Sequence, residues 1–422
     1  MPRTFGLIDG NSFYCSCERA FSPRLRGRAV VVLSNNDGCA VARTSEAKAA
    51  GIKMGDPWHL ARRRPEVRAA QIVWLSSNYS LYGDMSRRMY EVLAARVPRV
   101  EPYSIDEMFL DLDTPRDAAD LARELRDAVR RIAKIPTCVG IGPTKTIAKT
   151  ANAVAKADPA LDGVCDLRDE QDRARLYERT GVDEVWGIGG RTADKLGSLG
   201  ITTIARFVAM PPREVRTLLT VVGARVQMEL QGVSCLALSD AAPTRKGLAV
   251  TRCFGRPVTC WAEMREACAH HASRASEKLR AAGLVAGRMA VFLHTDPHGT
   301  GPWYSAQHAG RIEPTDDART LIAEAVRMLA PLWRDGHSYM KVGVMLDDLR
   351  DAATQPRSLF PTCNPARSAA LMRAMDGVNA RYGRGTLRPL ATGIARPWGT
   401  RAGLLTPRYT THAGEIMEAH AL

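Results

Sequence analysis

The chain has 422 residues, of which 45% are hydrophobic, so it is long enough for three or four domains that each have a core of their own. Its formal net charge of +14 favours a polyanionic partner such as a nucleic acid. No apolar run approaches the roughly 18 residues that cross a bilayer. None of the ten cysteines forms the C-x-x-C pair of a zinc ribbon or a thioredoxin-like site. The N-terminus lacks a charged-then-apolar signal region, so a reducing cytoplasm is the expected compartment.

The first predicted element is an apolar strand that ends in a carboxylate. Residues 4–9 form this strand with Asp9 at its end, and Asn11 or Ser12 would cap the helix that follows. Gly10, between them, lets the backbone approach a ligand closely. Because the helix would direct its free N–H groups back toward Asp9, this end of the strand is suited to bind a triphosphate.

Two aromatic residues open the predicted helix. Phe13 and Tyr14 would lie beside the sugar of any nucleotide held at the end of the strand. In the alternative interpretation, Asp9 is only a strand-end cap and both rings belong to the core. Taken alone, this first segment favours that alternative.

The next segment contains two candidate phosphate contacts. A buried strand, a turn, a helix and a longer amphipathic helix are predicted over residues 29–33, 35–38, 43–50 and 79–95. Arg43 and Lys48 lie in the first of the two helices, where they could contact phosphate oxygens. The alternative for each is a side chain that points into solvent.

A second acidic segment, over about 100–112, is predicted to form a hairpin. Its adjacent acids, Asp106 and Glu107, lie between two apolar runs, where they are costly to bury without a cation. If the hairpin neighbours the first strand, these acids converge with Asp9, and three clustered carboxylates favour Mg²⁺. Two such ions roughly 4 Å apart can support phosphoryl transfer. A polar hairpin tip without metal is the alternative.

A basic stripe follows the hairpin. A helix, a strand and a second helix, predicted over residues 117–133, 137–142 and 144–156, complete an α+β unit with one sheet. Lys145, Lys149 and Lys156 share one face of the second helix because they lie four and seven residues apart. This stripe could face the carboxylates and hold triphosphate oxygens. A solvated lysine face is the commoner use of such a pattern.

Near residue 180 the composition changes, and a helical region is predicted to extend to about residue 235. Gly187 and Gly189 lie in a turn between two helices, and the exposed N–H groups of this turn fit a phosphate oxygen. Arg191 and Lys195 follow on the second helix. The spacing resembles a helix-hairpin-helix element, which grips the DNA backbone without reading its sequence. A plain helix–helix turn is the alternative.

The rest of the chain is predicted to contain a second α+β block and a tail. A polar, turn-rich linker precedes the block. The block has helices near 261–282 and 316–334 and strands near 287–294 and 339–347. A Pro-interrupted stretch over 353–367 separates it from the tail. The nine histidines show no metal-binding spacing.

Together these residues resemble the Y-family of translesion DNA polymerases, and within it the bacterial DNA polymerase V subfamily, over essentially the whole chain. Besides the acidic segments, the matching stretches fall in the fingers (31–39, 53–58 and 76–79), the thumb (183–189) and the C-terminal region (383–387 and 406–411). The resemblance implies an error-prone, template-directed DNA polymerase that acts opposite damaged template in the SOS response.

The resemblance also implies a site for two Mg²⁺ ions, with Mn²⁺ able to substitute. Asp9 and Asp106 would bridge the two ions. Glu107 would complete the site at which the primer 3′-hydroxyl is activated. The carbonyl of Gly10 would ligate the metal on the nucleotide side.

By the same resemblance, the start of the first helix would hold the nucleotide. Phe13 and Tyr14 would donate backbone N–H groups to the triphosphate, with Tyr14 as the steric gate that excludes a ribose 2′-hydroxyl. Lys156 matches a triphosphate-binding lysine of the family.

The sequence departs from the family pattern at two of the phosphate contacts. Lys48 lies where relatives often carry Arg. Ser45 lies where many relatives place a Tyr that touches phosphate, so one contact is missing. Arg43 is the candidate that would compensate for it.

The architecture implied is an α+β multidomain right hand. Its parts would be a palm (1–170, with fingers inserted at about 20–80), a thumb with the helix-hairpin-helix (171–238), a linker (239–247), a little finger (248–350) and a C-terminal linker and tail (351–422). The fingers look small and no proofreading exonuclease is evident. Such a site would tolerate damaged templates.

One peptide in the C-terminal linker is suited to dock in an apolar groove. Gln355, Leu359 and Phe360 resemble the sliding-clamp-binding peptide of bacterial polymerases, although their spacing departs from its commonest form by one residue. Alternatively, Leu359 and Phe360 pack on a neighbouring domain. The resemblance implies primer-template DNA, deoxynucleotides, the processed UmuD protein as a dimer, RecA and the sliding clamp as partners, and no membrane.

Two other functions use some of the same features. A nucleotidyl cyclase can combine a palm-like sheet, paired acids and a triphosphate, although the helix-hairpin-helix and the basic second block serve no small-molecule product. A catalytically silent DNA-bound accessory protein would not need the three acids and Tyr14, all of which are present.

Overall fold

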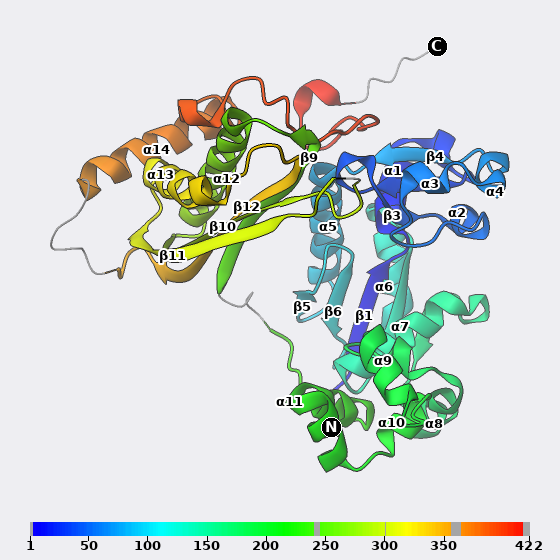
Figure 1. Cartoon of the computed structure of the whole chain (residues 1–422). Helices are drawn as coiled ribbons and strands as arrows, with labels where there is room; N and C mark the ends of the chain where they lie inside the picture. The colour runs from blue at the N-terminus through cyan, green and yellow to red at the C-terminus, as the bar shows by residue number, and fades with distance from the viewer. Residues whose placement is uncertain (1–2, 240–244, 300, 356–363, 417–422) are drawn as a thin grey trace. The chain divides into compact units, whose positions relative to one another are not determined.

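The computed structural model describes residues 3–239, 245–299, 301–355 and 364–416 (Figure 1). The chain divides into two compact units, and each is described by itself. Unit 1 is residues 1–34, 38–242 and 403–422, and unit 2 is residues 35–37 and 243–402. Within the described ranges, no helix is long and apolar enough to cross a membrane.

The larger sheet of unit 1 has five strands in the order β5-β6-β1-β7-β8. These strands are β1 (Phe5–Gly10), β5 (Val100–Pro102), β6 (Glu107–Asp111), β7 (Thr137–Gly142) and β8 (Val164–Asp166). β1 lies in the middle, is buried along its whole length and pairs antiparallel with both β6 and β7. The acid-bearing first strand and the acidic hairpin are therefore neighbours, which the sequence analysis could only assume.

Helices cover both faces of this sheet. The helices α1 (Phe13–Phe21), α5 (Tyr79–Ala94) and α6 (Ala118–Ile132) share one core with inward-facing residues of β1, β6 and β7. On the opposite face, α7 (Lys145–Ala157) packs against β7 and β1. All four lie close to their predicted ranges because amphipathic periodicity and capping residues define them locally, as with Asp117 at the start of α6.

The helix α7 lies so close to the sheet that only glycine fits beneath it. A Cβ atom added at Gly140 would lie 2.1 Å from the backbone nitrogen of Asn152 and 2.2 Å from the carbonyl oxygen of Ala148. The side-chain amide of Asn152 in turn donates to the carbonyl oxygens of Leu7 and Cys138, at 3.2 and 2.8 Å. These contacts fix the helix in register with β1 and β7.

A second sheet of unit 1 has three strands in the order β3-β2-β4. Its strands are β2 (Val30–Leu33), β3 (Ala40–Arg43) and β4 (Val73–Ser76), and the short helices near it are α2 (Ser45–Ala49), α3 (Trp58–Ala61) and α4 (Pro65–Ala69). Only β2 was predicted, because it is an unbroken, fully buried apolar run, whereas β3 and β4 are only partly buried and too short to show a clear alternation. The helix predicted over 43–50 begins later, since the Thr44 side chain accepts the N–H of Ala47 and caps it.

Residues 170–230 form a helical subdomain with its own small core, within unit 1. Its helices are α8 (Glu170–Arg179), α9 (Gly190–Gly197), α10 (Ile204–Val208) and α11 (Pro212–Leu230). The turn at Gly187 follows the short 3₁₀ segment η4 (Val182–Glu184), so the prediction of a full helix directly before it is wrong. Two of the three residues of η4, Asp183 and Glu184, are exposed. A segment of three residues forms only a single tight turn and not a helix with a buried face.

Unit 2 contains a four-stranded antiparallel sheet in the order β11-β10-β12-β9. Its strands are β9 (Gly247–Val258), β10 (Leu284–Thr295), β11 (Ser305–Thr315) and β12 (Tyr339–Asp351), and its helices are α12 (Trp261–Ala281), α13 (Ala318–Leu329) and α14 (Pro365–Tyr382). α12 and α13 share a core with one face of the sheet. The sequence analysis missed β9, β11 and α14. β11 alternates between exposed and half-buried residues, so its hydrophobic signal is weak.

We expect Gly140→Ala to destabilise unit 1, because its methyl group would meet the backbone of α7 rather than a flexible side chain. Overpacking of this kind costs roughly 1–3 kcal/mol. The matched control is Gly83→Ala in α5, where an added Cβ meets nothing within 4 Å and alanine should stabilise the helix by about 0.5–1 kcal/mol. Urea unfolding of both variants measures the difference, and equal midpoints would contradict the proposed close packing.

Candidate active site

The three predicted catalytic acids lie at one end of the five-stranded sheet. Asp9, at the end of β1, pairs in register with Glu107, the first residue of β6. The backbone N–H of Gly10 donates to the carbonyl oxygen of Asp106 at 2.9 Å. Tertiary pairing thus brings together residues that lie about a hundred positions apart in sequence.

The carboxylates are held by partners from the protein itself. Asp9 forms an ion pair with Lys156 and Glu107 forms one with Lys149, while the hydroxyl of Ser104 donates to Asp106 at 2.5 Å. Within the part of the chain that the structure describes, no three acidic, histidine or cysteine side chains are grouped as a ready-made metal site.

All three lysines of the predicted basic stripe pair with acids of the sheet. Besides Lys149 and Lys156, Lys145 contacts Glu101 at 2.6 Å. The stripe on α7 therefore faces the carboxylates, as one of the two sequence interpretations expected, and it is not a solvated face.

The donor atoms available at this edge suit a hard cation. Carboxylate oxygens of Asp9, Asp106 and Glu107 and the carbonyl of Gly10 are all oxygen donors, which Mg²⁺ prefers over nitrogen or sulfur. The pKa of Asp9 is raised to about 6: burial raises it most, Lys156 opposes the rise, and the nearby Asp106 and Glu107 add to it. A cation in this place would offset the same unfavourable burial of charge.

A cavity of about 380 Å³ opens beside these acids. Eight of the predicted site residues line it: Asp9, Gly10, Phe13, Tyr14, Arg43, Lys48, Asp106 and Lys156. Ser45 does not; it lies in an adjoining cavity of about 350 Å³, which Lys48 and Lys156 also line. Glu107 lines neither cavity, since its carboxylate is turned to Lys149.

The start of α1 faces the first cavity without a side-chain cap. Ser12 is the N-cap residue, but its backbone is left-handed, with φ of 47°, and it makes no capping hydrogen bond. Its hydroxyl donates instead to the carbonyl oxygen of Arg43 at 2.7 Å. The first turn of α1 thus keeps backbone N–H groups that a phosphate oxygen could accept.

Tyr14 is held in a group of aromatic rings that the sequence analysis did not identify as part of the site. Its ring stacks on Tyr82 with centroids 4.4 Å apart and meets Tyr79 edge-on at 6.0 Å. Burial raises the pKa of the Tyr14 hydroxyl. One feature of the sequence could have identified this group: Tyr79 and Tyr82 are three residues apart, which places both on one face of α5.

The predicted DNA-backbone turn lies next to a residue that contacts the acidic hairpin. The indole nitrogen of Trp186 donates to the hydroxyl of Tyr103 at 3.0 Å, and Lys149 lies over the Tyr103 ring at 4.8 Å. Gly187, with φ of 91°, and Gly189 are both exposed.

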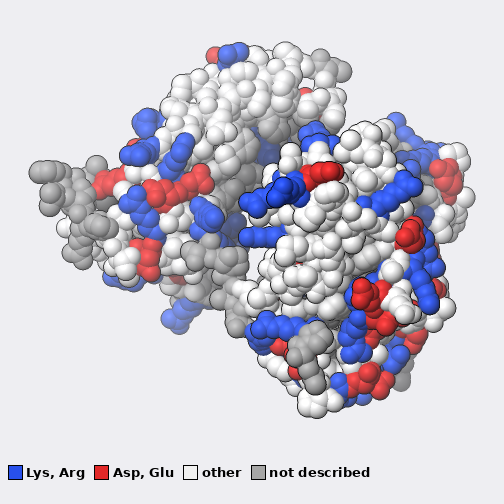
Figure 2. Space-filling view, turned by 90° about the horizontal axis from the view of Figure 1, so that it is seen from below, with Lys and Arg blue, Asp and Glu red and all other residues white. Residues whose placement is uncertain are grey.

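The two basic residues that follow this turn differ in their contacts. Arg191 is exposed at the start of α9, whereas the ammonium of Lys195 donates to the carbonyl oxygen of Leu218 at 3.1 Å. Lysine and arginine side chains also gather in groups over the face shown in Figure 2, with acids interspersed.

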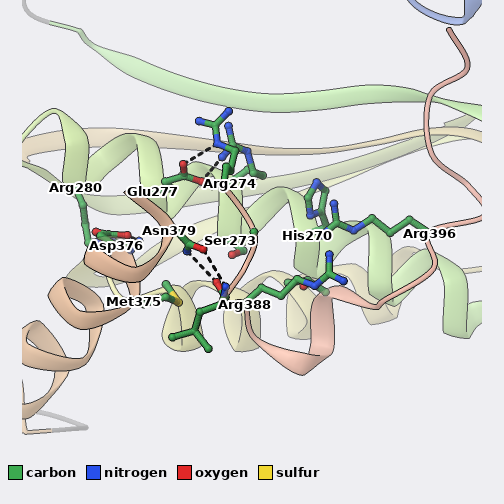
Figure 3. Close-up of a pocket in the computed structure, with 14 residues that line it drawn as sticks. His270, Ser273, Arg274, Glu277, Arg280, Met375, Asp376, Asn379, Arg388 and Arg396 are labelled. Carbon is green, nitrogen blue, oxygen red and sulfur yellow. Dashed lines mark hydrogen bonds and ion pairs between the residues drawn. The ribbon is translucent and has the colours of Figure 1, made fainter. Parts of the chain in front are cut away.

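The predicted clamp-binding peptide lies only partly within the described residues. Gln355 is half-buried, while Leu359 and Phe360 lie outside the described residues. A separate cavity in unit 2, lined mainly by polar and charged residues, contains none of the predicted site residues (Figure 3).

Family comparisons cover most of the chain. Residues 8–153 match the impB/mucB/samB family, and residues 245–359 match the impB/mucB/samB family C-terminal domain. Residues 369–419 match a domain of unknown function.

Full-length relatives agree with these matches. The chain is 42% identical to the protein UmuC of Salmonella typhimurium, with 98% of this chain and 99% of that protein covered. It is equally similar to the protein SamB of Salmonella typhimurium, with the same coverage, and 28% identical to DNA polymerase IV 1 of Bacillus subtilis over 91% of this chain and 92% of the relative. Relatives of this kind indicate a general dependence on divalent metal and an ability to bind DNA.

A solved structure shows the same fold. A Y-family DNA polymerase chimera of Dbh and Dpo4 superposes with a TM-score of 0.67 and 19% identity, covering 82% of this chain and 99% of the chimera. The predicted α+β multidomain polymerase fold is therefore confirmed, and a role in the SOS response fits the UmuC-like relatives. The relatives support the polymerase interpretation rather than a cyclase or a silent accessory protein. The chain belongs to the impB/mucB/samB family of Y-family proteins and is a DNA-directed DNA polymerase of the translesion type.

Proposed function

We propose that the end of the five-stranded sheet is the polymerase active site, with Asp9, Asp106 and Glu107 as its catalytic acids. The observation that carries this proposal is the single cavity that joins Asp9, Asp106, Lys156 and Tyr14 at the uncapped start of α1. These acids and the carbonyl of Gly10 would hold two Mg²⁺ ions, or Mn²⁺ in their place. The bound ions would activate the primer 3′-hydroxyl and stabilise the leaving phosphate.

The lysines of α7 would change partners when substrate binds. In the protein alone, Lys156 and Lys149 neutralise Asp9 and Glu107. Once cations take over that task, the Lys156 ammonium becomes available to the triphosphate. Arg43, Lys48 and the first-turn N–H groups of α1 would contact the same phosphates.

Tyr14 would act as the steric gate against ribonucleotides. The ring is a rigid wall because Tyr82 stacks on it and Tyr79 meets its edge. A ribose 2′-hydroxyl has to be excluded by such a fixed surface, since a mobile side chain would simply move aside. Phe13, which precedes it and is buried, would support the backbone that faces the triphosphate.

The remaining segments would serve DNA and partner proteins. The turn at Gly187 and Gly189, with Arg191 and Lys195 after it, would contact the DNA backbone. In the right-hand architecture, residues 1–170 would be the palm with fingers at about 20–80, residues 171–238 the thumb, residues 248–350 the little finger and residues 351–422 a C-terminal tail. The processed UmuD dimer, RecA and the sliding clamp are the proposed partners, in the cytoplasm.

Asp106→Asn should abolish most primer extension while DNA binding survives. The substitution keeps the shape of the side chain but removes a negative charge that would hold Mg²⁺, and loss of one charge-stabilising group typically costs at least about 100-fold in rate. Primer extension opposite an abasic template site, together with gel-shift binding of the same DNA, measures both properties.

The matched control for this experiment is Asp113→Asn, because Asp113 is exposed in the loop after β6. It removes the same charge a few residues away and should extend primers like the wild type. Near-normal extension by the Asp106→Asn variant would contradict the assignment.

Replacement of Leu359 and Phe360 by Ala should abolish clamp-stimulated synthesis but leave distributive synthesis unchanged. The two side chains would be the apolar anchors of a peptide that docks on the clamp. Pull-down with purified clamp and primer extension with and without clamp provide the measurement. If both proteins bind the clamp equally, the peptide has a structural role instead.

A further inference from the structure

Unit 2 contains a cavity of about 260 Å³ that the proposed polymerase site does not use (Figure 3). It lies between α12, α14 and the segment over residues 384–396, and α14 and this segment fall largely within the matched domain of unknown function. Its titratable lining consists of five arginines, two acids and one histidine: Arg274, Arg280, Arg384, Arg388, Arg396, Glu277, Asp376 and His270.

The two acids compensate only some of these arginines. Asp376 accepts two hydrogen bonds from Arg280, each at 2.7 Å. Glu277 is shared between Arg274 and Arg384. The acids of the cavity are thus fully engaged by three of the five guanidinium groups.

The other two guanidinium groups are not paired with the acids of the cavity. Arg388 donates to the carbonyl oxygen of Ile394 at 3.4 Å. Glu266, which does not line the cavity, acts on Arg396 through its charge. Among the residues that the structure describes, neither Arg388 nor Arg396 forms an ion pair, and both extend toward the space below His270 (Figure 3). The Nε atom of Arg396 is buried without a hydrogen-bond partner. Burial and the surrounding arginines lower the pKa of His270 to about 4, so this ring stays neutral and the excess charge is that of the arginines.

We propose that this cavity is a binding site for a phosphate group. Guanidinium forks match the oxygens of phosphate and bind them in bidentate fashion. Ser273 and Asn379 also line the cavity. The hydroxyl of Ser273 can donate to an oxyanion, and so can the second amide hydrogen of Asn379, whose first is donated to the carbonyl oxygen of Leu387. The phosphate is either a free anion or part of a nucleic-acid backbone, and both would present the same oxygens to Arg388 and Arg396.

The proposal is tested with inorganic phosphate as the probe. Binding to the full-length protein is followed by thermal shift at constant ionic strength, with a chelator present so that metal at the polymerase site contributes nothing. We expect Arg388→Gln/Arg396→Gln to weaken phosphate binding at least tenfold. The control, Arg373→Gln/Arg381→Gln, removes two exposed arginines of α14 and should bind phosphate like the wild type.

Equal phosphate affinity in the wild type and in Arg388→Gln/Arg396→Gln would overturn the proposal. If that protein does not fold, the single variants Arg388→Gln and Arg396→Gln are each expected to bind phosphate more weakly. A short single-stranded oligonucleotide distinguishes the two sources. If the oligonucleotide competes with phosphate in the wild type but not in Arg388→Gln/Arg396→Gln, the site binds the nucleic-acid backbone. If the oligonucleotide does not compete with phosphate in the wild type, the site binds a free anion.

A second and independent observation concerns the C-terminal segment over residues 403–416, which belongs to unit 1. Its backbone docks beside β4, where the N–H of Ser76 donates to the carbonyl oxygen of Leu404 at 3.0 Å. The ring of Tyr409 stacks on Phe21 of α1, with centroids 4.9 Å apart. The segment is therefore packed on the elements that frame the nucleotide cavity.

Continuous contacts lead from this segment to Tyr14. The hydroxyl of Thr406 donates to the carboxylate of Glu18 at 3.1 Å, and the hydroxyl of Tyr82 donates to the same oxygen at 2.7 Å. Tyr82 in turn stacks on Tyr14 with ring planes 13° apart. At the start of α5, the amide of Asn78 also donates to the Thr406 hydroxyl and carbonyl oxygens, each at 3.0 Å.

The carboxylate of Glu18 makes this arrangement sensitive to the tail. Its residue is 1% exposed, burial raises its pKa, and the hydrogen bonds from Tyr82 and Thr406 oppose that rise. A buried carboxylate that loses one of two donors is strongly destabilised and draws in water or shifts its remaining partner. That remaining partner is the ring on which Tyr14 rests.

We infer that the C-terminal segment positions Tyr14 through Glu18 and Tyr82, and thereby sets how strictly ribonucleotides are excluded. This inference rests on the steric-gate role proposed above for Tyr14. Tyr82 and Thr406 are positioning residues, because they act on the substrate only through Tyr14. Thr406 lies in the part of the chain that matches a domain of unknown function. By this inference, that part of the chain contributes to the exclusion of ribonucleotides by Tyr14, which lies almost four hundred residues earlier in the sequence.

The readout is the ratio of kcat/KM for a deoxyribonucleotide to that for the matching ribonucleotide. We expect Thr406→Val and Tyr82→Phe each to lower this ratio several-fold, with no additional loss in the double variant. In a Tyr14→Ala background neither substitution should change the ratio. Thr411→Val and Tyr90→Phe, at exposed positions of the same segment and of α5, are the matched controls.

The outcomes separate the two proposals. If Tyr14→Ala leaves the ratio unchanged, Tyr14 is not the gate. If Tyr14→Ala lowers the ratio but Thr406→Val and Tyr82→Phe do not, the gate is correct and the positioning role is wrong. The positioning role would also be overturned if Thr406→Val changed the ratio equally in the wild-type and in the Tyr14→Ala background. Glu18→Gln, which keeps an acceptor for both hydroxyls, should largely preserve the ratio.

Discussion

Charge compensation between the acidic edge of one sheet and a single helix is the interaction on which the catalytic unit depends. Asp9 and Glu107 lie side by side on paired strands, where uncompensated like charges would be costly. Lys156 and Lys149 of α7 form ion pairs with them, and Gly140 lets this helix lie close to the sheet that carries both acids. Close backbone packing and the electrostatics of the site are thus one constraint, and in the proposed function the lysines would hold the positions that bound cations take over.

The stacking of aromatic rings around Tyr14 is a second constraint on the cavity beside Asp9, which is the cavity proposed to hold the nucleotide. The ring is supported by Tyr82, and Tyr82 is anchored through Glu18 to Thr406 near the end of the chain. A side chain that discriminates a single hydroxyl group has to be held to a fraction of an ångström by its neighbours. The C-terminal segment therefore contributes to the geometry of a site built otherwise from the first half of the chain.

The two units differ in how far their basic side chains are paired with acids. In unit 1, Lys145, Lys149 and Lys156 each form an ion pair with an acid of the sheet, so their charges are compensated within the protein. In unit 2, Arg388 and Arg396 face a cavity and are not paired with its acids. A net charge of +14 is consistent with both arrangements, because it says nothing about where cations are paired.

Local periodicity was sufficient to predict the acid-ended strand at Asp9, the hairpin with Asp106 and Glu107, and the lysine face of α7, because strand ends, turns and helix faces follow from it. That these elements meet could be seen only in the fold, because strand pairing joins residues about a hundred positions apart. The support of Tyr14 by the tail had no local signal at all. Hydrogen bonds such as that of Thr406 to Glu18 depend on how distant segments pack, which no window of sequence contains.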